Sequence, residues 1–496
     1  MSDPGALPPD FRISLDSGVR RLDDAKVLVG GTPLRILRLA PAGVRAVDEL
    51  AAGGPVGASS GRAALARRLL DAGMAHPRPG RARHSIDDVT IVVPVRDDQH
   101  GLDETLAAVG PASAVIVVDD GSTVPLDCRA VPPNSRVVPL HSRAVPLDSQ
   151  EARVLRHDRS AGPAAARNTG WRAARTELVA FVDAGCQPDG GWLERLLPHF
   201  ADAAVAAVAP RVLSPRDTGA PGVLAAYEAL RSPLDQGPRE STVRPGTAVA
   251  YVPTATLIVR RAVLEGLSGF DESMRFGEDV DLVWRMTAAG WTVRYEPGVS
   301  VTHPARRTRR AWLRQRYEYG TSAAPLARRH DGAVAPLRVA SWSAAVWALV
   351  ALRKPAGGIA LAALTTALLG RRLHELDHPW QEAGRLAGLG HLYAGRQVAS
   401  AIRRAWWPIA LLVAVVWPRT RIGFAAALTV PLLAEWIERR PDVSLSRWIG
   451  LRILDDAAYG AGLWAGCWRE RSAAALTPDL TSWPGRSPAS VSVPDP

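Results

Sequence analysis

Two acidic clusters, far apart in the sequence, have the residue types expected of a site that binds a polar ligand and transfers a group. Asp119-Asp120-Gly121-Ser122 closes the apolar run 114–118, and Glu278-Asp279 stands just before a helical pattern. Carboxylates after a strand can accept hydrogen bonds from a ribose or a base, and a carboxylate at a helix start can take a proton from a hydroxyl. Each cluster also occurs without function, as a turn or as a favourable helix start. Together they predict nucleotide-dependent group transfer.

Three further motifs carry possible chemistry. The run from Gly162 to Gly170 places small residues at a helix start and Arg167 one turn later, which suits a diphosphate, or equally an Arg that pairs with the sheet. Asp183 ends the apolar run 178–182 and is either a helix cap or a ligand of a metal that bridges a diphosphate. His303 follows a short strand pattern and is either structural or part of a metal shell.

The elements that must position these residues are predicted to form an α/β structure. Apolar runs at 89–95, 114–118 and 178–182 alternate with a helical pattern at 102–109, as expected of a parallel sheet covered by helices. Ligands bind at the carboxyl ends of such strands, where Pro94 and Val95 also stand. Between residues 124 and 155 the chain repeats Val-Pro-Leu, which predicts an expanded surface loop.

A small strand-and-helix module precedes this region. Apolar runs at 27–29 and 34–39 flank Gly30-Gly31, which predicts a hairpin turn. Helical patterns follow at 44–50 and 63–72, and the Pro- and Arg-rich stretch from Pro77 predicts a linker.

The C-terminal third is rich in Ala, Leu and Trp. Its apolar stretches, at 339–352, 356–370, 405–417 and 422–437, are each shorter than the roughly 20 residues of a straight membrane span. They predict short membrane-associated helices paired as hairpins, with a soluble helical bundle as the alternative. The Arg-rich connector at 371–404 would stay on the cytoplasmic side. From Leu476 the Pro- and Ser-rich tail is expected to be disordered.

Composition limits the partners. The 496 residues carry a formal net charge of +11, and nearly every cation is Arg, which suits an anionic ligand or a membrane surface. No nucleic-acid-binding motif is present, so nucleic acid is not an expected partner. The three cysteines have no paired spacing, and no secretory signal is visible at Met1. We therefore expect a cell-membrane protein whose catalytic domain lies on the cytoplasmic side.

Taken in order, the motifs resemble those of family 2 glycosyltransferases with the GT-A fold, which is Rossmann-like with a mostly parallel sheet. The resemblance covers about residues 85–320. It implies inverting transfer of a sugar from a nucleotide sugar, with Mg²⁺ or Mn²⁺ holding the diphosphate. By position it implies nucleoside contacts from Asp119 and Asp120, a donor contact from Arg167, a metal or ribose contact from Asp183, and a catalytic base at Asp279 beside Glu278. Pro94 and Val95 are further donor-side candidates, and Asp281, Trp284 and Arg285 are acceptor-side candidates. His303, a water or Asp189 is the candidate for a further metal ligand.

The chain departs from the family pattern in two places. Gly185 stands where the family usually has the second Asp of its metal motif. The Gln-x-x-Arg-Trp signature of processive synthases is missing around Arg316-Tyr317, which disfavours synthesis of long polymers.

The N-terminal module is similar to winged-helix-like α+β modules that recognise ribosomally made peptides. With a GT-A domain and an apolar tail behind it, the order resembles glycosyltransferases of the mycofactocin system. This resemblance implies a peptide-derived acceptor, mycofactocin or its precursor, and glucose from UDP-glucose added as a short chain. The expected domains are residues 1–85, 86–325, 326–475 and the tail 476–496. Alternatives are a cell-envelope lipid or polysaccharide glycosyltransferase and a non-catalytic sugar-nucleotide or peptide-binding scaffold.

Overall fold

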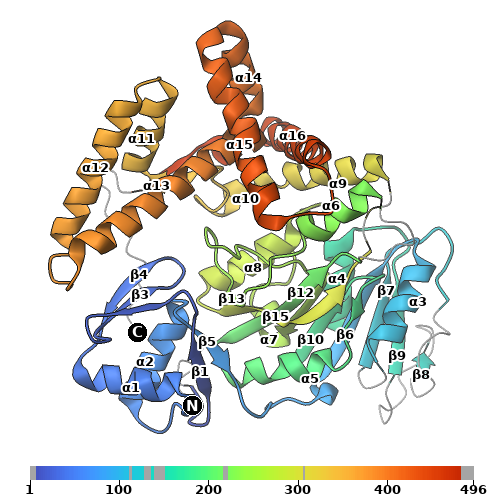
Figure 1. Ribbon diagram of the computed structural model, residues 1–496. Helices are drawn as coiled ribbons and strands as arrows, with labels where there is room; N and C mark the ends of the chain where they lie inside the picture. Colours follow the sequence, from blue (N-terminus) through green and yellow to red (C-terminus); the bar gives the residue numbers. More distant parts are fainter. Residues whose placement is uncertain are drawn as a thin grey trace. The chain divides into compact units, whose positions relative to one another are not determined.

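The computed structural model describes residues 7–110, 114–127, 136–138, 151–215, 222–304, 306 and 308–481 (Figure 1). Its contacts divide the chain into two compact units. We call them the sheet unit, Met1–Ala220 with Glu228–Ala305, and the helical unit, Pro221–Tyr227 with Arg306–Pro496. Most of the loop predicted between residues 124 and 155 lies outside the described residues.

A large mixed sheet forms the centre of the sheet unit. Its strands are β6 (Val89–Val95), β7 (Ala114–Asp119), β8 (Arg136–Val138), β9 (Glu151–Arg156), β10 (Leu178–Val182), β11 (Gln187–Pro188), β12 (Val205–Leu213), β13 (Ser241–Thr242), β14 (Thr256–Arg260) and β15 (Thr292–Thr302). In the described chain the order is β11-β15-β12-β14-β10-β6-β7-β9-β8, and β13 pairs with β15. The strands from β10 to β8 run parallel, whereas β14 is antiparallel to both of its neighbours. The predicted mostly parallel α/β sheet is confirmed.

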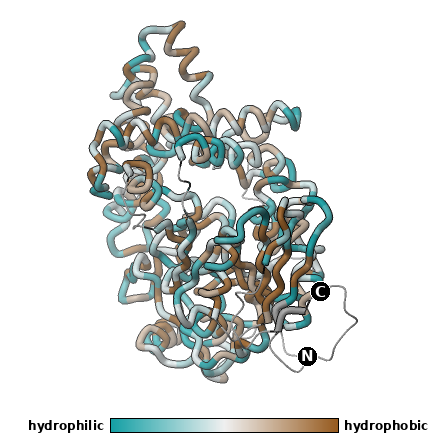
Figure 2. The backbone as a smooth tube through the Cα atoms, turned by 90° about the vertical axis from the view of Figure 1, so that its right-hand side faces the viewer, coloured by the Kyte–Doolittle hydropathy of each residue, from teal (hydrophilic) through white to brown (hydrophobic). Residues whose placement is uncertain are grey.

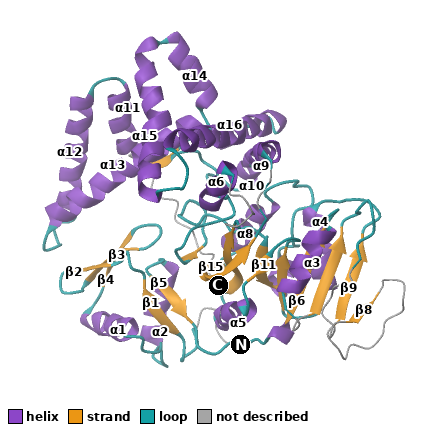
Figure 3. Ribbon diagram, turned by 45° about the vertical axis from the view of Figure 1, so that its right-hand side comes forward, coloured by secondary structure: helices purple, strands orange, loops and turns teal. Residues whose placement is uncertain are grey.

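Helices cover both faces of this sheet (Figure 3). On one face, α3 (Gln99–Ala108) and α5 (Trp192–Leu196) pack into a core with alternate residues of β6, such as Ile91 and Val93. On the other, α4 (Pro163–Ala173) approaches so closely that a Cβ at Gly170 would lie 2.2 Å from Val92 Cγ1. The remaining helices of the unit are α7 (Arg261–Gly266) and α8 (Glu278–Ala288), while α6 (Val223–Arg231) runs across the boundary between the units. Figure 2 shows hydrophobic residues gathered along the strands.

The N-terminal module has its own small core. Strands β2 (Arg20–Leu22), β3 (Val27–Gly30) and β4 (Arg35–Arg38) form an antiparallel sheet, β1 (Arg12–Leu15) pairs with β5 (Ala75–Arg78), and the helices are α1 (Pro41–Ala51) and α2 (Ser60–Asp71). Leu28, Val47, Leu50 and Leu69 are buried together. The predicted hairpin at Gly30-Gly31 and both helices are confirmed, and the comparison with a winged helix stays a prediction.

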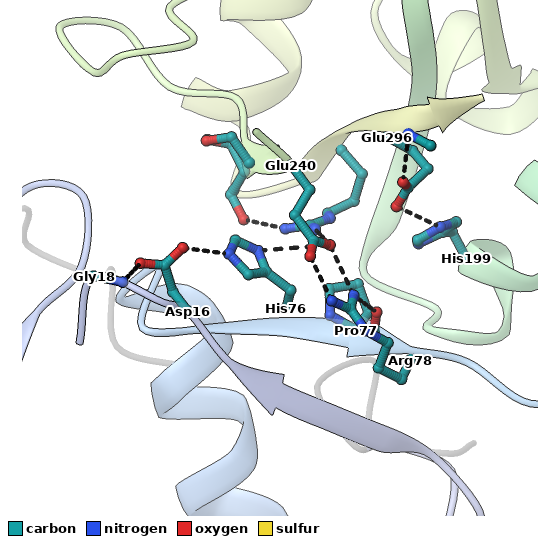
Figure 4. A network of polar contacts seen from close by, with 12 residues as sticks. Asp16, Gly18, His76, Pro77, Arg78, His199, Glu240 and Glu296 are labelled. Atoms are coloured by element: carbon teal, nitrogen blue, oxygen red, sulfur yellow. Dashed lines mark hydrogen bonds and ion pairs between the residues drawn. The ribbon is translucent and has the colours of Figure 1, made fainter. Parts of the chain in front are cut away.

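Paired ions join this module to the rest of the sheet unit (Figure 4). Arg67 on α2 donates two hydrogen bonds to the Asp202 carboxylate, at 2.7 and 2.9 Å. Arg78 at the end of β5 does the same to Glu240, with one bond of 2.8 Å. His76 Nε2 lies 2.9 Å from Asp16 within the module. Bidentate Arg–carboxylate pairs fix orientation as well as distance, so the module is held in a defined place.

The helical unit contains α9 (Arg309–Thr321), α10 (Ala323–Arg329), α11 (Ser341–Ala351), α12 (Pro355–Arg372), α13 (Pro379–Arg404), α14 (Trp407–Val416), α15 (Arg421–Arg439) and α16 (Leu445–Arg469). The four predicted apolar stretches are helices, and residues 353–354 and the 3-10 turn Pro418–Thr420 lie between the helices of each pair. Among the described residues, Pro418–Arg439 is the helix that by itself is long and apolar enough to cross a membrane. Pro379–Arg404 and Trp407–Val416 meet this criterion only together and are bent by 88° between them.

A short strand stands at residues 479–481, where disorder was predicted. β16 (Arg338–Ala340) pairs in parallel with β17 (Asp479–Thr481). Disorder from Leu476 was therefore the wrong expectation for these residues, because backbone pairing compensates for their polar composition. The rest of the tail lies outside the described residues.

Candidate active site

The strand register brings the predicted donor residues to one edge of the sheet. Val95 at the end of β6 is opposite Asp119 at the end of β7, and β10, which precedes Asp183, is the other neighbour of β6. The amide of Asp120 donates to the carbonyl of Val95 at 2.9 Å, and that of Asp183 to the carbonyl of Ala255. Pro94, Val95, Asp119, Asp120 and Asp183 thus come together as expected for ligand binding at carboxyl strand ends.

Asp119 is buried and already partnered. Its carboxylate accepts from the amide of Ser122 at 2.8 Å and forms an ion pair with Arg156. Arg156 also donates to the carbonyl of Ser122 at 2.7 Å. Since both carboxylate oxygens have partners within the chain, Asp119 shapes the turn that follows β7. Its predicted contact with a nucleoside stays a prediction.

Asp120 organises the turn that leads into α4. Its carboxylate accepts from the amides of Ala161 and Gly162 at 2.8 and 2.9 Å and from the Ser160 hydroxyl at 2.7 Å, and it lies 2.8 Å from His157 Nδ1. Burial raises the pKa of Asp120, but these four hydrogen bonds outweigh it and lower the pKa. The motif that begins at Gly162 was expected to offer free amides to a diphosphate. Asp120 occupies the amide of Gly162, the first residue of that motif, and a diphosphate contact by the amides that follow stays a prediction.

Arg167 lies at the centre of a buried ion network. Its two terminal nitrogens donate to Asp183 Oδ1 and Glu278 Oε1, each at 2.8 Å, and its side chain is 6% exposed. Burial lowers the pKa of Arg167, but the charges of Asp183 and Glu278 outweigh it and raise the pKa. The cation therefore ties the end of β10 to the start of α8. A direct contact with a donor diphosphate stays a prediction.

The Glu278-Asp279 pair lies at the N-terminus of α8, after Gly277 in a left-handed conformation with φ +81°. Burial and the charge of Asp279 raise the pKa of Glu278 to about 7, and burial raises the pKa of Asp279. Asp279 Oδ1 accepts from the amide of Val280 at 2.8 Å. No basic side chain among the described residues forms an ion pair with Asp279, whereas Glu278 is paired with Arg167. Asp279 is thus the carboxylate of the pair without a fixed cation.

The predicted acceptor-side residues bind other parts of the chain. Arg285 donates to Asp281 on the previous turn of α8 and to the carbonyls of Leu267 and Gly269, each at 2.7 Å. The indole of Trp284 donates to the carbonyl of Ala250, also at 2.7 Å. Asp281 and Trp284 are buried. Their positions explain how α8 is anchored, and a contact with an acceptor stays a prediction.

The described side chains do not supply a ready metal site. No group of three or more His, Cys, Asp and Glu among them could hold a metal ion. The Asp183 carboxylate already binds Arg167, and His303 Nδ1 lies 2.9 Å from the carbonyl of Pro304. At Gly185, φ is +86° and a Cβ would lie 2.9 Å from Pro304 Cγ, so an aspartate there would be strained. The expected cation stays a prediction.

Sequence reasoning missed three side chains that hold the site together: Arg156, His157 and Asn168. His157 links Asp120 to the hydroxyl of Thr169 at 2.9 Å, and Asn168 binds the backbone of Phe270. Asn168 directly follows Arg167, which is the one local signal that could have drawn attention to it. Apart from Trp171, which shares α4 with Asn168, the partners of all three lie in other segments of the chain, so their roles depend on the fold.

The sheet gathers carboxylates at its strand ends, and Arg167 ties them to a second acidic pair on α8, so the site has the residue types of a group-transfer enzyme. The family model described as glycosyl transferase family 2 matches residues 90–266. The chain is also 40% identical over 486 residues to the pre-mycofactocin glycosyltransferase of Mycobacterium tuberculosis, covering 96% of this chain and 98% of that protein.

The chain therefore belongs to the family 2 glycosyltransferases and, within them, aligns over nearly its whole length with the mycofactocin system enzyme. The prediction of a family 2 enzyme is confirmed. The glycosyltransferase AglE of Haloferax volcanii is 29% identical over 224 residues, 44% of this chain and 67% of that protein. A mannosyltransferase structure from Pyrobaculum calidifontis, with GDP-Man and Mn²⁺, shares 16% identity over 79% of this chain and 91% of that one. Its TM-score of 0.41 adds nothing to the assignment.

Proposed function

We propose that this enzyme transfers a hexose, glucose from UDP-glucose, to a mycofactocin precursor and builds a short oligosaccharide with inversion at the anomeric carbon. The observation that carries the proposal is the 40% identity, over 96% of the chain, to a relative named for pre-mycofactocin. A cell-envelope lipid or polysaccharide as acceptor is the alternative. None of the relatives described above that would support it aligns over a comparable share of this chain.

In the proposed reaction, Asp279 is the general base. The acceptor hydroxyl gives its proton to the Asp279 carboxylate while its oxygen forms a bond to the anomeric carbon. The bond from that carbon to the diphosphate oxygen breaks, and the nucleoside diphosphate leaves with the electron pair. Asp279 is favoured over Glu278 because it has no cationic partner among the described side chains. A raised pKa also suits a base that works near neutral pH.

Glu278, Arg167 and Asp183 have a supporting role in this scheme. Three carboxylates crowd around one guanidinium, which limits their mutual repulsion. Because Arg167 binds both Asp183 and Glu278, it fixes the donor edge of the sheet relative to the start of α8. Orientation of this kind is worth a large part of a reaction barrier.

The other two parts of the chain have proposed roles in bringing the acceptor to the site. The N-terminal module would bind the peptide-derived part of the acceptor in the manner of a winged-helix-like recognition domain. The helical unit would attach the enzyme to lipids at the cytoplasmic face of the cell membrane. Many large apolar side chains on α12, α14 and α15 are exposed, among them Ile359, Leu412, Val416 and Ile422, and such a surface is unusual for a soluble monomer.

Mass spectrometry of small-molecule extracts tests the acceptor and the sugar together. Cells with the gene should contain a peptide-derived cofactor with hexose increments, and cells without the gene should contain the same cofactor without them. Unchanged cofactor masses, together with altered envelope glycans, would favour the cell-envelope alternative.

A further inference from the structure

The loop that leads into α8 is held from α4 by one amide side chain. Asn168 Nδ2 donates to the carbonyl of Phe270 at 2.8 Å and to Glu272 Oε1 at 2.7 Å. Its Oδ1 accepts from the amide of Phe270 and from the indole of Trp171, both at 2.9 Å. Asn168 is 1% exposed, and these four bonds use its whole hydrogen-bonding capacity.

The same loop is held from the other side by α8 itself. Arg285 donates to the carbonyls of Leu267 and Gly269 and pairs with Asp281. Gly269, which lies between the bonds from Asn168 and those from Arg285, has a φ of +68°, and a Cβ there would lie 2.4 Å from Asn168 Oδ1. The loop backbone therefore lies directly against the Asn168 amide, with no room for a side chain.

Phe270, the residue that Asn168 holds by both backbone groups, contacts the ion network. The centroid of its ring lies 5.6 Å from Arg167 Cζ. The ring also packs edge-on against the ring of Phe181, with 5.2 Å between the two centroids. Arg167 in turn binds Asp183 and Glu278. A chain of direct contacts thus runs from Asn168 through Phe270 and Arg167 to the acidic pair at the start of α8.

We propose that Asn168 is a positioning residue for sugar transfer: by fixing Phe270 against Arg167, it sets the placement of Glu278 and Asp279 relative to the donor edge of the sheet. This inference rests on the proposed function of the Glu278-Asp279 pair. A buried asparagine that merely satisfies a loop would matter for stability alone, so the test must separate placement from folding.

Two variants make this separation. Asn168→Ala removes the hold on Phe270, whereas Trp171→Phe removes one of the bonds to Asn168 and leaves both bonds to Phe270. For Asn168→Ala in the full chain, we expect kcat for transfer to fall on the order of 10- to 100-fold, with the KM for the nucleotide sugar within about twofold. The acidic limb of its pH profile should move to higher pH, because Arg167 lowers the pKa of both carboxylates from a fixed place.

Amide hydrogen exchange measures how firmly the loop is fixed, and this measurement needs no acceptor. The amide of Phe270 should exchange faster in Asn168→Ala than in Trp171→Phe when both are measured well below their melting temperatures. Trp171→Phe should retain a wild-type pH profile. The proposal is overturned if folded Asn168→Ala keeps the wild-type kcat and pH profile, or if Trp171→Phe loses as much activity. Absence of any sugar transfer by the wild-type enzyme would instead contradict the proposed function. The exchange data would still show whether Asn168 fixes the backbone of Phe270.

Discussion

At the scale of single residues, two adjacent carboxylates acquire different properties from their neighbours. Glu278 is buried and forms an ion pair with Arg167. The Asp279 carboxylate accepts a hydrogen bond from the amide of Val280 and has no ion-pair partner among the described residues. Burial raises the pKa of both side chains. Groups that interact this closely titrate as a pair. The difference in partners, rather than in residue type, is the reason why we propose Asp279 as the base.

The raised pKa values predict how activity depends on pH. A general base must be deprotonated, so kcat/KM should be constant at alkaline pH and fall as pH drops through the apparent pKa of the pair, which lies above the range of unperturbed carboxylates because both pKa values are raised. The decrease should approach roughly tenfold per pH unit below that point. Initial rates of UDP release measured across the range, with stability checked at each pH, give the profile. A limb near pH 4, where unperturbed carboxylates titrate, would contradict the assignment.

Much of the residue-level site was accessible from the sequence, but the hydrogen-bond partners were not. Asp119, Asp120, Asp183 and Glu278 follow strands or begin a helix, and local patterns locate such positions. Arg156 and His157 stand more than 30 residues from the carboxylates that they bind. Contacts of that kind depend on strand register, which local sequence does not specify.

At the scale of elements, Asp120 couples the end of β7 to the start of α4. Replacing Asp120 by Ala leaves two backbone amides, a hydroxyl and His157 without their acceptor. We expect a loss of roughly 1 to 2 kcal/mol in the free energy of unfolding, because four hydrogen bonds to one carboxylate are lost while the exposed Ser160 and Ala161 can bind water instead. Because the pKa of Asp120 is lowered, its contribution in the wild type is present at neutral pH and is lost below about pH 4.

Chemical denaturation at pH 7 and at pH 3.5 measures this contribution. The difference between the wild type and Asp120→Ala should be large at about pH 7 and shrink at about pH 3.5, where Asp120 begins to be protonated. Equal differences at the two pH values would show that the loss reflects packing rather than the charge.

The parallel strands were the most predictable elements. β6 and β10 coincide with the apolar runs 89–95 and 178–182, because strands buried on both faces have nearly continuous apolar sequences. β14 was missed. Its sequence, Thr256 to Arg260, looks like the others, but it runs antiparallel between β10 and β12. Strand direction depends on how the preceding connection crosses the sheet, and nothing in a five-residue run records that path.

At the scale of the whole molecule, the exposed apolar helices predict attachment to lipid. Leu412 and Val416 on α14 are 63% and 57% exposed. Replacing both by Glu should release the full chain from vesicles, since a charge at hydrocarbon depth costs roughly 3 kcal/mol per side chain. Leu34→Glu is the matched control, because Leu34 is 60% exposed on the N-terminal module. Vesicle flotation that is unchanged in the double variant would favour the soluble-bundle alternative for α11 to α15.

The central claim is that Asp279 of a family 2 glycosyltransferase deprotonates a mycofactocin-related acceptor. The most direct test is single-turnover hexose transfer from UDP-glucose by purified Asp279→Asn, with Glu265→Gln as control. Glu265 is 49% exposed and pairs with Arg261 on its own helix. We predict that Asp279→Asn loses on the order of 10²- to 10⁴-fold in rate while it still binds UDP, and that Glu265→Gln transfers at the wild-type rate. Transfer by Asp279→Asn within about threefold of the wild type, well short of what loss of a general base removes, would contradict the claim.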